Sequence, residues 1–190
     1  MPNYCSNTVT LEHADPAMIA RARSAFEAGR FLEEFIPCPT PDDWSNGNIA
    51  NWGTVWDVGG EDASIQDIPG GLMLSFDSAW APPINAYQQL IEQGFQVYAN
   101  YYEPGMAFAG IWDNGSDDYF EYGGMTADEI EATLPPELDE AYGISQAVSE
   151  WEQEQEEENL DIDLDSGLSA TNEQDSDNLD IDVNNTGGKW

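Results

Sequence analysis

The first part of the chain alternates between strand-like and helix-like patterns of hydrophobic positions. Residues 5–13 (CSNTVTLEH) alternate and are rich in Thr and Val, which predicts a strand. Residues 15–29 (DPAMIARARSAFEAG) predict a helix, because Asp15 suits the N-cap, Pro16 suits the first helical position, and a glycine ends the segment. Three prolines within residues 35–44 (FIPCPTPDDW) then predict an irregular path.

The middle of the chain continues this alternation. Two strands are predicted at residues 51–58 (NWGTVWDV) and 71–80 (GLMLSFDSAW), with a segment rich in Gly and Asp between them. Residues 82–94 (PPINAYQQLIEQG) predict a helix that starts at proline and stops at glycine. Residues 95–102 (FQVYANYY) and 106–115 (MAFAGIWDNG) predict two more strands, and a turn with a short edge strand follows them.

This order of elements predicts an α+β fold, with a ferredoxin-like antiparallel sheet packed on helices in residues 1–122. From Thr126 the pattern becomes helical, and Thr126 with Glu129 matches a capping box. We therefore expect an acidic helical extension over residues 123–158. Aromatic residues are then absent until the last position of the sequence, so residues 159–190 are expected to form a flexible acidic tail that contains a repeat.

The charge balance constrains function most strongly. The 190 residues include 4 basic and 38 acidic ones, a formal net charge of −34. Three basic residues lie near the N-terminus and the fourth is Lys189, so residues 31–188 contain no cation but 35 carboxylates, which are the 38 minus Glu12, Asp15 and Glu27. Nucleic acids and anionic membranes need Lys or Arg to neutralise phosphate, so we expect neither as a direct partner. Such a field attracts basic surfaces of other proteins.

Three alternative causes of this acidity stay open. A halophilic source makes protein surfaces acidic, a solvated tail accounts for the 13 carboxylates within residues 151–188, and metal chelation needs clustered ligands. Asp161, Asp163 and Asp165 match the first ligand positions of a calcium loop, but Ser166 stands where that loop requires glycine. No metal site is therefore expected.

Four separated motifs resemble the YubB-type ferredoxin-like family of plasmids and phages. They are MPNYCSNTVTL (1–11), IANWGTVWDV (49–58), LSFDSAWAPPI (74–84) and YYEPGMAFAG (101–110). The resemblance covers roughly residues 1–122 and implies a ferredoxin-like fold and a mobile-element origin. It implies no established activity and no catalytic residues, and the acidic segment beyond it lies outside the family pattern.

Aromatic residues recur at alternate positions of the predicted strands: Trp52, Trp56, Phe76, Trp80 and Tyr102. We expect them to fill the core or to cover one face of the sheet. The alternative, a platform on which nucleic-acid bases stack, would lack the cationic frame that such sheets use.

The sequence offers little catalytic chemistry, and we expect no enzyme activity and no cofactor. His13 is the only histidine, and Cys5 lies too far away along the same predicted strand to pair with it. The double glycines match no phosphate-binding motif. Cys5 and Cys38 have no zinc-site spacing, and two thiols are favoured, although their number also allows one disulfide.

A short motif occurs twice near the C-terminus, as NLDIDLDSG in residues 159–167 and as NLDIDVNNTG in residues 178–187. In an extended chain each copy would place its apolar residues on one face and its aspartates on the other. We therefore expect two docking strands that add to a sheet edge of this protein or of a partner, and a disordered solvated tail is the alternative. The docking residues are Leu160, Ile162, Leu164, Leu179, Ile181 and Val183.

Together these features predict a DNA-charge mimic from a phage or plasmid that acts without turnover in the cytoplasm of the host bacterium. It would occupy the basic groove of a host DNA-binding defence protein, such as a restriction, CRISPR or recombination component. The carboxylates expected to bind that partner are Asp113, Asp117, Asp118, Glu121, Asp128, Glu129, Glu131, Glu137, Asp139, Glu140, Glu150, Glu152, Glu154, Glu156, Glu157 and Glu158. The alternative is a mobile-element adaptor that joins proteins through the repeated tail motif.

The cation-free stretch predicts that the purified protein binds no nucleic acid. A gel-shift assay with duplex or single-stranded oligonucleotides at physiological salt should leave the oligonucleotides unshifted, because no basic surface is available to replace their counterions. A clear shift would contradict the electrostatic argument.

Overall fold

The computed structural model describes residues 3–38 and 44–170, and residues 158–170 by their backbone. The chain divides after Ser145 into two units, and each is described by itself. This division differs from the boundaries at residues 122 and 158 that the sequence predicts.

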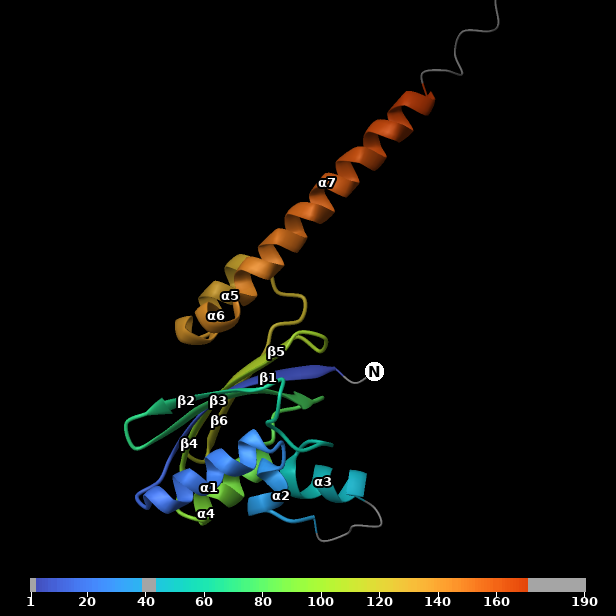
Figure 1. Cartoon of the computed structure of the whole chain (residues 1–190). Coiled ribbons are helices and arrows are strands. Elements are labelled where there is room, and N and C mark those ends of the chain that lie inside the picture. The colour runs from blue at the N-terminus through green and yellow to red at the C-terminus, as the bar shows by residue number, and fades with distance from the viewer. Residues whose placement is uncertain (1–2, 39–43, 171–190) are drawn as a thin grey trace, which may run out of the picture. The chain divides into compact units, whose positions relative to one another are not determined.

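An antiparallel sheet of six strands forms the centre of the first unit (Figure 1). The strands are β1 (Tyr4–Glu12), β2 (Ser64–Ile68), β3 (Gly71–Ala79), β4 (Gln96–Glu103), β5 (Phe108–Asp113) and β6 (Ser116–Glu121). Their order across the sheet is β2-β3-β1-β4-β5-β6, so β1 lies inside the sheet and β2 and β6 are its edges. The α+β class predicted from the sequence is confirmed, and so is the position of β6 as an edge strand.

Seven helices occur in the described part of the chain. They are α1 (Pro16–Glu27), α2 (Phe31–Phe35), α3 (Trp44–Trp52), α4 (Ile84–Glu92), α5 (Ala127–Thr133), α6 (Pro136–Tyr142) and α7 (Ile144–Ala170). Helices α1 to α4 cover one face of the sheet (Figure 1), which is called the first face below. Helix α1 has the predicted cap, because the Asp15 side chain accepts a hydrogen bond from Ala17 N at 2.9 Å.

The main hydrophobic core lies between the first face and these helices. Strand β1 alternates strictly, so that Val9 and Leu11 are buried in this core while their neighbours face the other side. Cys5 is buried on the same side in a smaller cluster with Tyr101 and Phe108. Helix α1 adds Phe26 and α4 adds Leu90 to the same core. Burial of each large apolar side chain of this kind contributes about 1.5–3 kcal/mol to folding.

Helices α5 and α6 belong to the same unit and pack over the second face of the sheet. Three tyrosine rings connect them, because Tyr102 of β4 stacks on Tyr122 at 6.2 Å and on Tyr142 at 5.1 Å between ring centroids. The Tyr142 hydroxyl donates a hydrogen bond to Asn100 O at 2.8 Å. Thr126 and Glu129 form the predicted capping box at the start of α5. The segment after residue 122 is thus part of the folded unit.

The strand predicted at residues 51–58 is wrong. Its first residues end helix α3, where the buried indole N–H of Trp52 donates to Ile36 O at 2.7 Å, and Gly53 then turns the chain with φ 87°. The strand lies instead in the predicted Gly- and Asp-rich spacer, as β2. An edge strand needs only one partner and little burial, so β2 lacks the apolar alternation that would identify it. Helix α2, which ends inside the segment predicted as irregular, was not predicted.

The five aromatic residues of the family-like motifs have different environments. Trp52 and Phe76 are buried and Tyr102 packs between two tyrosines, as expected. Trp56 lies in the loop after α3 and is half-buried. Trp80 follows β3 with φ 68° and remains 48% exposed, so neither of these tryptophans lies in a strand.

No helix among the described residues is both long enough and apolar enough to cross a membrane. Both cysteines are thiols; Cys5 is fully buried and Cys38 is half-buried.

The two thiols are predicted to differ in reactivity. Burial raises the pKa of Cys5 to about 12, and thiolate is the reactive form. At pH 8 iodoacetamide should therefore modify Cys38 and leave Cys5 intact, and both should react in 6 M guanidinium. Mass spectrometry of a Cys38→Ser variant isolates Cys5, and rapid labelling of the native variant would contradict the buried position.

Candidate protein-binding surface

The described arginines lie together on and beside α1, and each is paired with carboxylates. Arg21 and Arg30 both contact Glu34, at 2.7 Å in each case. Arg23 contacts Glu27 at 3.5 Å and also pairs with Asp67 of β2. The cations are therefore neutralised locally, and the carboxylates elsewhere in the described chain have no cation beside them.

The sheet places one group of predicted acids at its β5–β6 edge. Asp113 ends β5, and Asp117, Asp118 and Glu121 lie on β6, all of them exposed. Asp118 is paired with Ile111, Ile111 with Asn100 of β4, and Asn100 with Thr8 of β1, so the side chain of Asp118 lies on the second face of the sheet. Asp117 and Glu121 point to the first face.

Asp117 is tied to the core by a buried tyrosine. The Tyr101 hydroxyl donates to the Asp117 carboxylate at 2.6 Å, and burial together with this bond raises the pKa of Tyr101. The Tyr101 ring passes directly over Gly110 of β5, where an added Cβ would lie 2.2 Å from the ring. Gly110 therefore allows the contact, and Asp117 has a fixed orientation at the surface.

Helices α5 and α6 supply the second group of acids. Asp128, Glu131, Glu137 and Glu140 are exposed. Glu129 is also exposed but completes the capping box.

Asp139 differs from the other acids of α6. It is half-buried, and its two oxygens accept from Ser145 N at 2.7 Å and from Ser145 Oγ at 2.6 Å. Of the acids predicted on these helices, Asp139 therefore fits a structural role best.

Two exposed tyrosines lie among these acids, on opposite sides of the sheet, and were missed in the sequence. Tyr98 of β4 is 37% exposed; burial raises its pKa, and the charges of Glu137 and Asp113 raise it further, so these two acids flank it. Tyr119 of β6 is 48% exposed and has Glu121 and Asp117 beside it. Exposed tyrosines are typical anchors of protein–protein interfaces. The exposed acids of β5, β6, α5 and α6, together with Tyr98 and Tyr119, are called the acidic face below, although Asp117, Tyr119 and Glu121 lie on the other side of the sheet from α5 and α6.

The second unit contains the remaining predicted acids on helix α7. Glu150, Glu154, Glu156 and Glu157 are exposed and Glu152 is half-buried. At about 1.5 Å rise per residue, these five charges lie within about 10 Å, or about one per 2.6 Å. That density falls between about 3.4 Å per charge for one DNA strand and about 1.7 Å for the duplex. Only the backbone of Glu158 is described.

The first copy of the repeated tail motif is helical, because α7 continues to Ala170. The extended strand predicted for Leu160, Ile162 and Leu164 is therefore not the conformation of this segment. A helix satisfies its own backbone hydrogen bonds, whereas an unpaired strand does not. The second copy, with Leu179, Ile181 and Val183, lies outside the described residues.

Residues with metal-binding side chains do not cluster in groups of three within the described part of the chain. His13 packs on Phe95 with ring centroids 4.8 Å apart, and its Nδ1 accepts from Asp15 N at 2.9 Å, which is a structural role.

Comparison with known proteins finds no match to the chain among family models, curated proteins or solved structures. The resemblance to the YubB-type family therefore stays a prediction.

Helix α7 is predicted to be weakened by its own charge. Glu150 and Glu154, and Glu152 and Glu156, are like charges four residues apart, and each such pair costs about 0.2–0.5 kcal/mol. Replacing Glu154 and Glu156 with Gln should slow amide hydrogen exchange over residues 150–157 about 2- to 5-fold at low salt.

The matched control for this prediction is the same pair of proteins in 1 M NaCl, where the screening length falls to about 3 Å and the difference should disappear. Equal exchange of the variant and the parent at low salt would show that repulsion does not limit the helix.

Proposed function

We propose that this protein is a non-enzymatic DNA-charge mimic that occupies the basic groove of a DNA-binding protein. The observation that carries the proposal is the acidic face: exposed carboxylates of α6 and β5 flank Tyr98 on the second face, carboxylates of β6 flank Tyr119 on the first face, and no cation lies among them. A rigid support for these charges distinguishes a mimic from a solvated acidic tail.

Rigidity is supported by how the acids are held. The hydrogen bond between Tyr101 and Asp117 fixes one carboxylate on the sheet edge. The stack of Tyr102, Tyr122 and Tyr142 fixes α5 and α6 on the second face. A partner that binds these charges therefore does not have to order them first, which lowers the entropic cost of association.

The charge spacing along α7 supports the same function. Its glutamates present a linear charge density within the range of nucleic-acid strands, although they lie in a separate unit. A basic groove that binds a phosphate backbone also attracts a helix with this charge density, and binding of the helix in the groove excludes DNA from it.

The finer fold assignment and the origin are part of the proposal. Elements β1, α1, β2, β3, α4 and β4, with the sheet order β2-β3-β1-β4, support a ferredoxin-like core. In this assignment α2 and α3 are inserted before β2, and β5 and β6 extend the sheet. The four motifs support a YubB-type protein of a phage or plasmid, which would act in the bacterial cytoplasm against a restriction, CRISPR or recombination component.

The adaptor alternative has less support. It depends on two equivalent docking strands, and the first of them is helical in the described backbone.

The proposal is tested by competition with DNA. The immobilised full-length protein should capture basic DNA-binding proteins from a bacterial lysate at 50 mM NaCl. Each captured protein, once purified, should bind this protein or a 20-base-pair duplex but not both at once. Its affinity for this protein should fall at least about 10-fold between 50 and 500 mM NaCl. A ternary complex with DNA, or affinity independent of salt, would reject charge mimicry.

Paired charge removals locate the binding surface. Asp118→Asn with Glu137→Gln removes two acids of the acidic face and should weaken binding about 2- to 30-fold, from about 0.2–1 kcal/mol for each exposed ion pair. The matched control, Glu61→Gln with Glu92→Gln, removes the same charge from other exposed sites and should change affinity less than about 2-fold. Equal effects of the two pairs would assign binding to net charge alone.

A further inference from the structure

An aromatic and acidic pocket lies away from the acidic face, where β2 begins. Strand β2 begins at Ser64, opposite Ser75, so residues 76–79 of β3 have no strand beside them on that edge. The loop after α3 covers this edge, and Thr54 Oγ1 accepts from Ala79 N at 2.9 Å and donates to Ala79 O at 3.2 Å. The hollow between the loop and the sheet has a volume of about 450 Å³.

The loop that forms one wall of the pocket is fixed at two points. Asp57 accepts hydrogen bonds from Leu32 N at 2.6 Å, Glu33 N at 2.8 Å and Val58 N at 2.8 Å. Gly59 approaches α1 so closely, with φ 103°, that a Cβ would lie 2.1 Å from Phe26 O. The wall is therefore formed in advance, and the Asp57 carboxylate is occupied by its structural role.

Aromatic rings line the mouth of this pocket. Tyr4 of β1 is 54% exposed, and its ring lies 6.0 Å from that of Trp56 at an angle of 47°. Phe76 adds a third ring to the lining. Aromatic rings that line a hollow bind a cation when it lies over a ring face within about 6 Å of the ring centroid.

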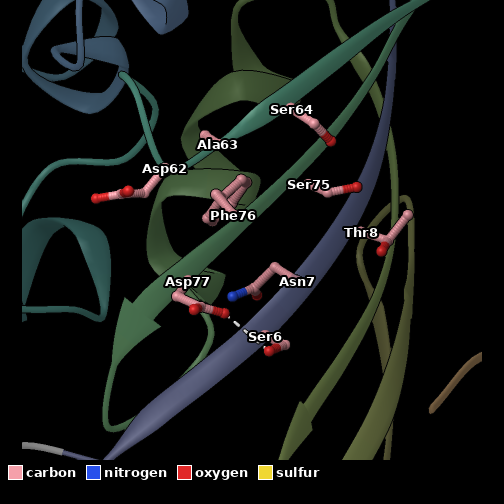
Figure 2. Close-up of a pocket in the computed structure, with 9 residues that line it drawn as sticks. All are labelled: Ser6, Asn7, Thr8, Asp62, Ala63, Ser64, Ser75, Phe76 and Asp77. Carbon is pink, nitrogen blue, oxygen red and sulfur yellow. Dashed lines mark hydrogen bonds between the residues drawn. The ribbon is translucent and has the colours of Figure 1, made fainter.

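Asp62 and Asp77 are the carboxylates of the pocket that are not occupied by backbone N–H groups, as Asp57 is. Asp77 accepts from Ser6 Oγ at 2.8 Å, which orients it and uses one of its oxygens (Figure 2). Asp62 is exposed and has no hydrogen-bond or ion-pair partner among the described residues. In Figure 2 its side chain points away from the hydroxyl groups of Ser64 and Ser75.

A second hollow of about 320 Å³ lies beside the pocket, and both are lined by Asp62, Ala63, Phe76 and Asp77. The second hollow is lined by the hydroxyl groups of Ser6, Thr8, Ser64 and Ser75 (Figure 2). Both volumes lie in the range of ligand pockets, about 300–1,000 Å³. A long side chain that enters past the rings would meet carboxylates first and hydroxyl acceptors beyond them.

We infer that this pocket binds the guanidinium group of an arginine on the partner protein. Guanidinium is favoured over ammonium because it is planar, stacks on aromatic faces and donates several N–H groups in a fork to carboxylates. The identity of the partner rests on the proposed function, whereas binding of guanidinium by the pocket is tested without that partner.

The test uses N-acetyl-arginine amide as the probe and the neutral isostere N-acetyl-citrulline amide as its control. The full-length protein is titrated at 150 mM NaCl, and the backbone amide signals of Ser6 and Gly59 are followed by NMR. The arginine probe should give saturable shifts with a Kd of order 1 mM, about 4 kcal/mol of binding free energy, and citrulline should give none.

Variants of the pocket residues test whether the arginine probe binds in the pocket. Asp62→Asn with Asp77→Asn should weaken binding of the arginine probe about 2- to 30-fold, and Trp56→Leu should weaken it about 2- to 5-fold. Asp128→Asn with Glu131→Gln removes the same charge from exposed positions of α5 and should change the affinity less than 2-fold. Melting temperatures of the variants establish that each is folded.

Three outcomes would overturn the inference. Equal binding of citrulline, or equal loss in the α5 control variant, would assign the shifts to the general field of an acidic protein. Equal affinity for N-acetyl-lysine amide would reject the preference for guanidinium. Failure of the DNA-competition test alone would leave the titration with the arginine probe valid, because the acidic face and the pocket are changed by different variants.

Discussion

Repulsion among carboxylates is the force that every other part of this structure has to overcome. A chain with 38 acidic and 4 basic residues gains little from ion pairs, and the three described arginines are used within one small region around α1. Folding therefore depends on burial of apolar and aromatic side chains against the two faces of one sheet. The strict alternation of β1 serves this purpose, because Val9 and Leu11 belong to the core of the first face and Cys5 packs with Tyr101 and Phe108, while their neighbours face the other side.

The two faces of the sheet have different roles. The first face forms the main core with α1 to α4 and contains most of the large buried side chains. On the second face α5 and α6 pack against β4 and β5, through the stack of Tyr102, Tyr122 and Tyr142. The other end of this face is polar, with Ser6, Thr8 and Ser75 at the hydroxyl-lined hollow. The fold thus supports an acidic surface at one end of the sheet and a pocket at the other, and neither contains a cation.

Both surfaces combine carboxylates with exposed aromatic rings, and this combination suits a basic protein better than it suits a metal or a nucleic acid. On the acidic face Tyr98 and Tyr119 are flanked by acids, and in the pocket Tyr4 and Trp56 are near Asp62 and Asp77. Long-range attraction by the net charge speeds encounter with many basic surfaces, whereas rings and oriented carboxylates can select among them. Specificity in such a protein therefore has to come from the few positions where a ring and a carboxylate act together.

The sequence by itself determined the strongly periodic elements and the sign of the field. Strands β1, β3, β4 and β5 and helices α1, α4 and α5 were predictable, because buried faces impose a period of two or 3.6 and because Asp15 and Thr126 cap their helices locally. Tertiary structure alone decided α3 and β2, since an edge strand leaves no such period, and neither does a helix that is held by hydrogen bonds from Trp52 to Ile36 O and from Gln89 to Asn51 O. It also decided the site. Tyr98, Tyr119 and the Tyr4–Trp56 pair acquire their carboxylate neighbours only when distant strands and loops come together, and no local pattern in the chain records which side chains meet.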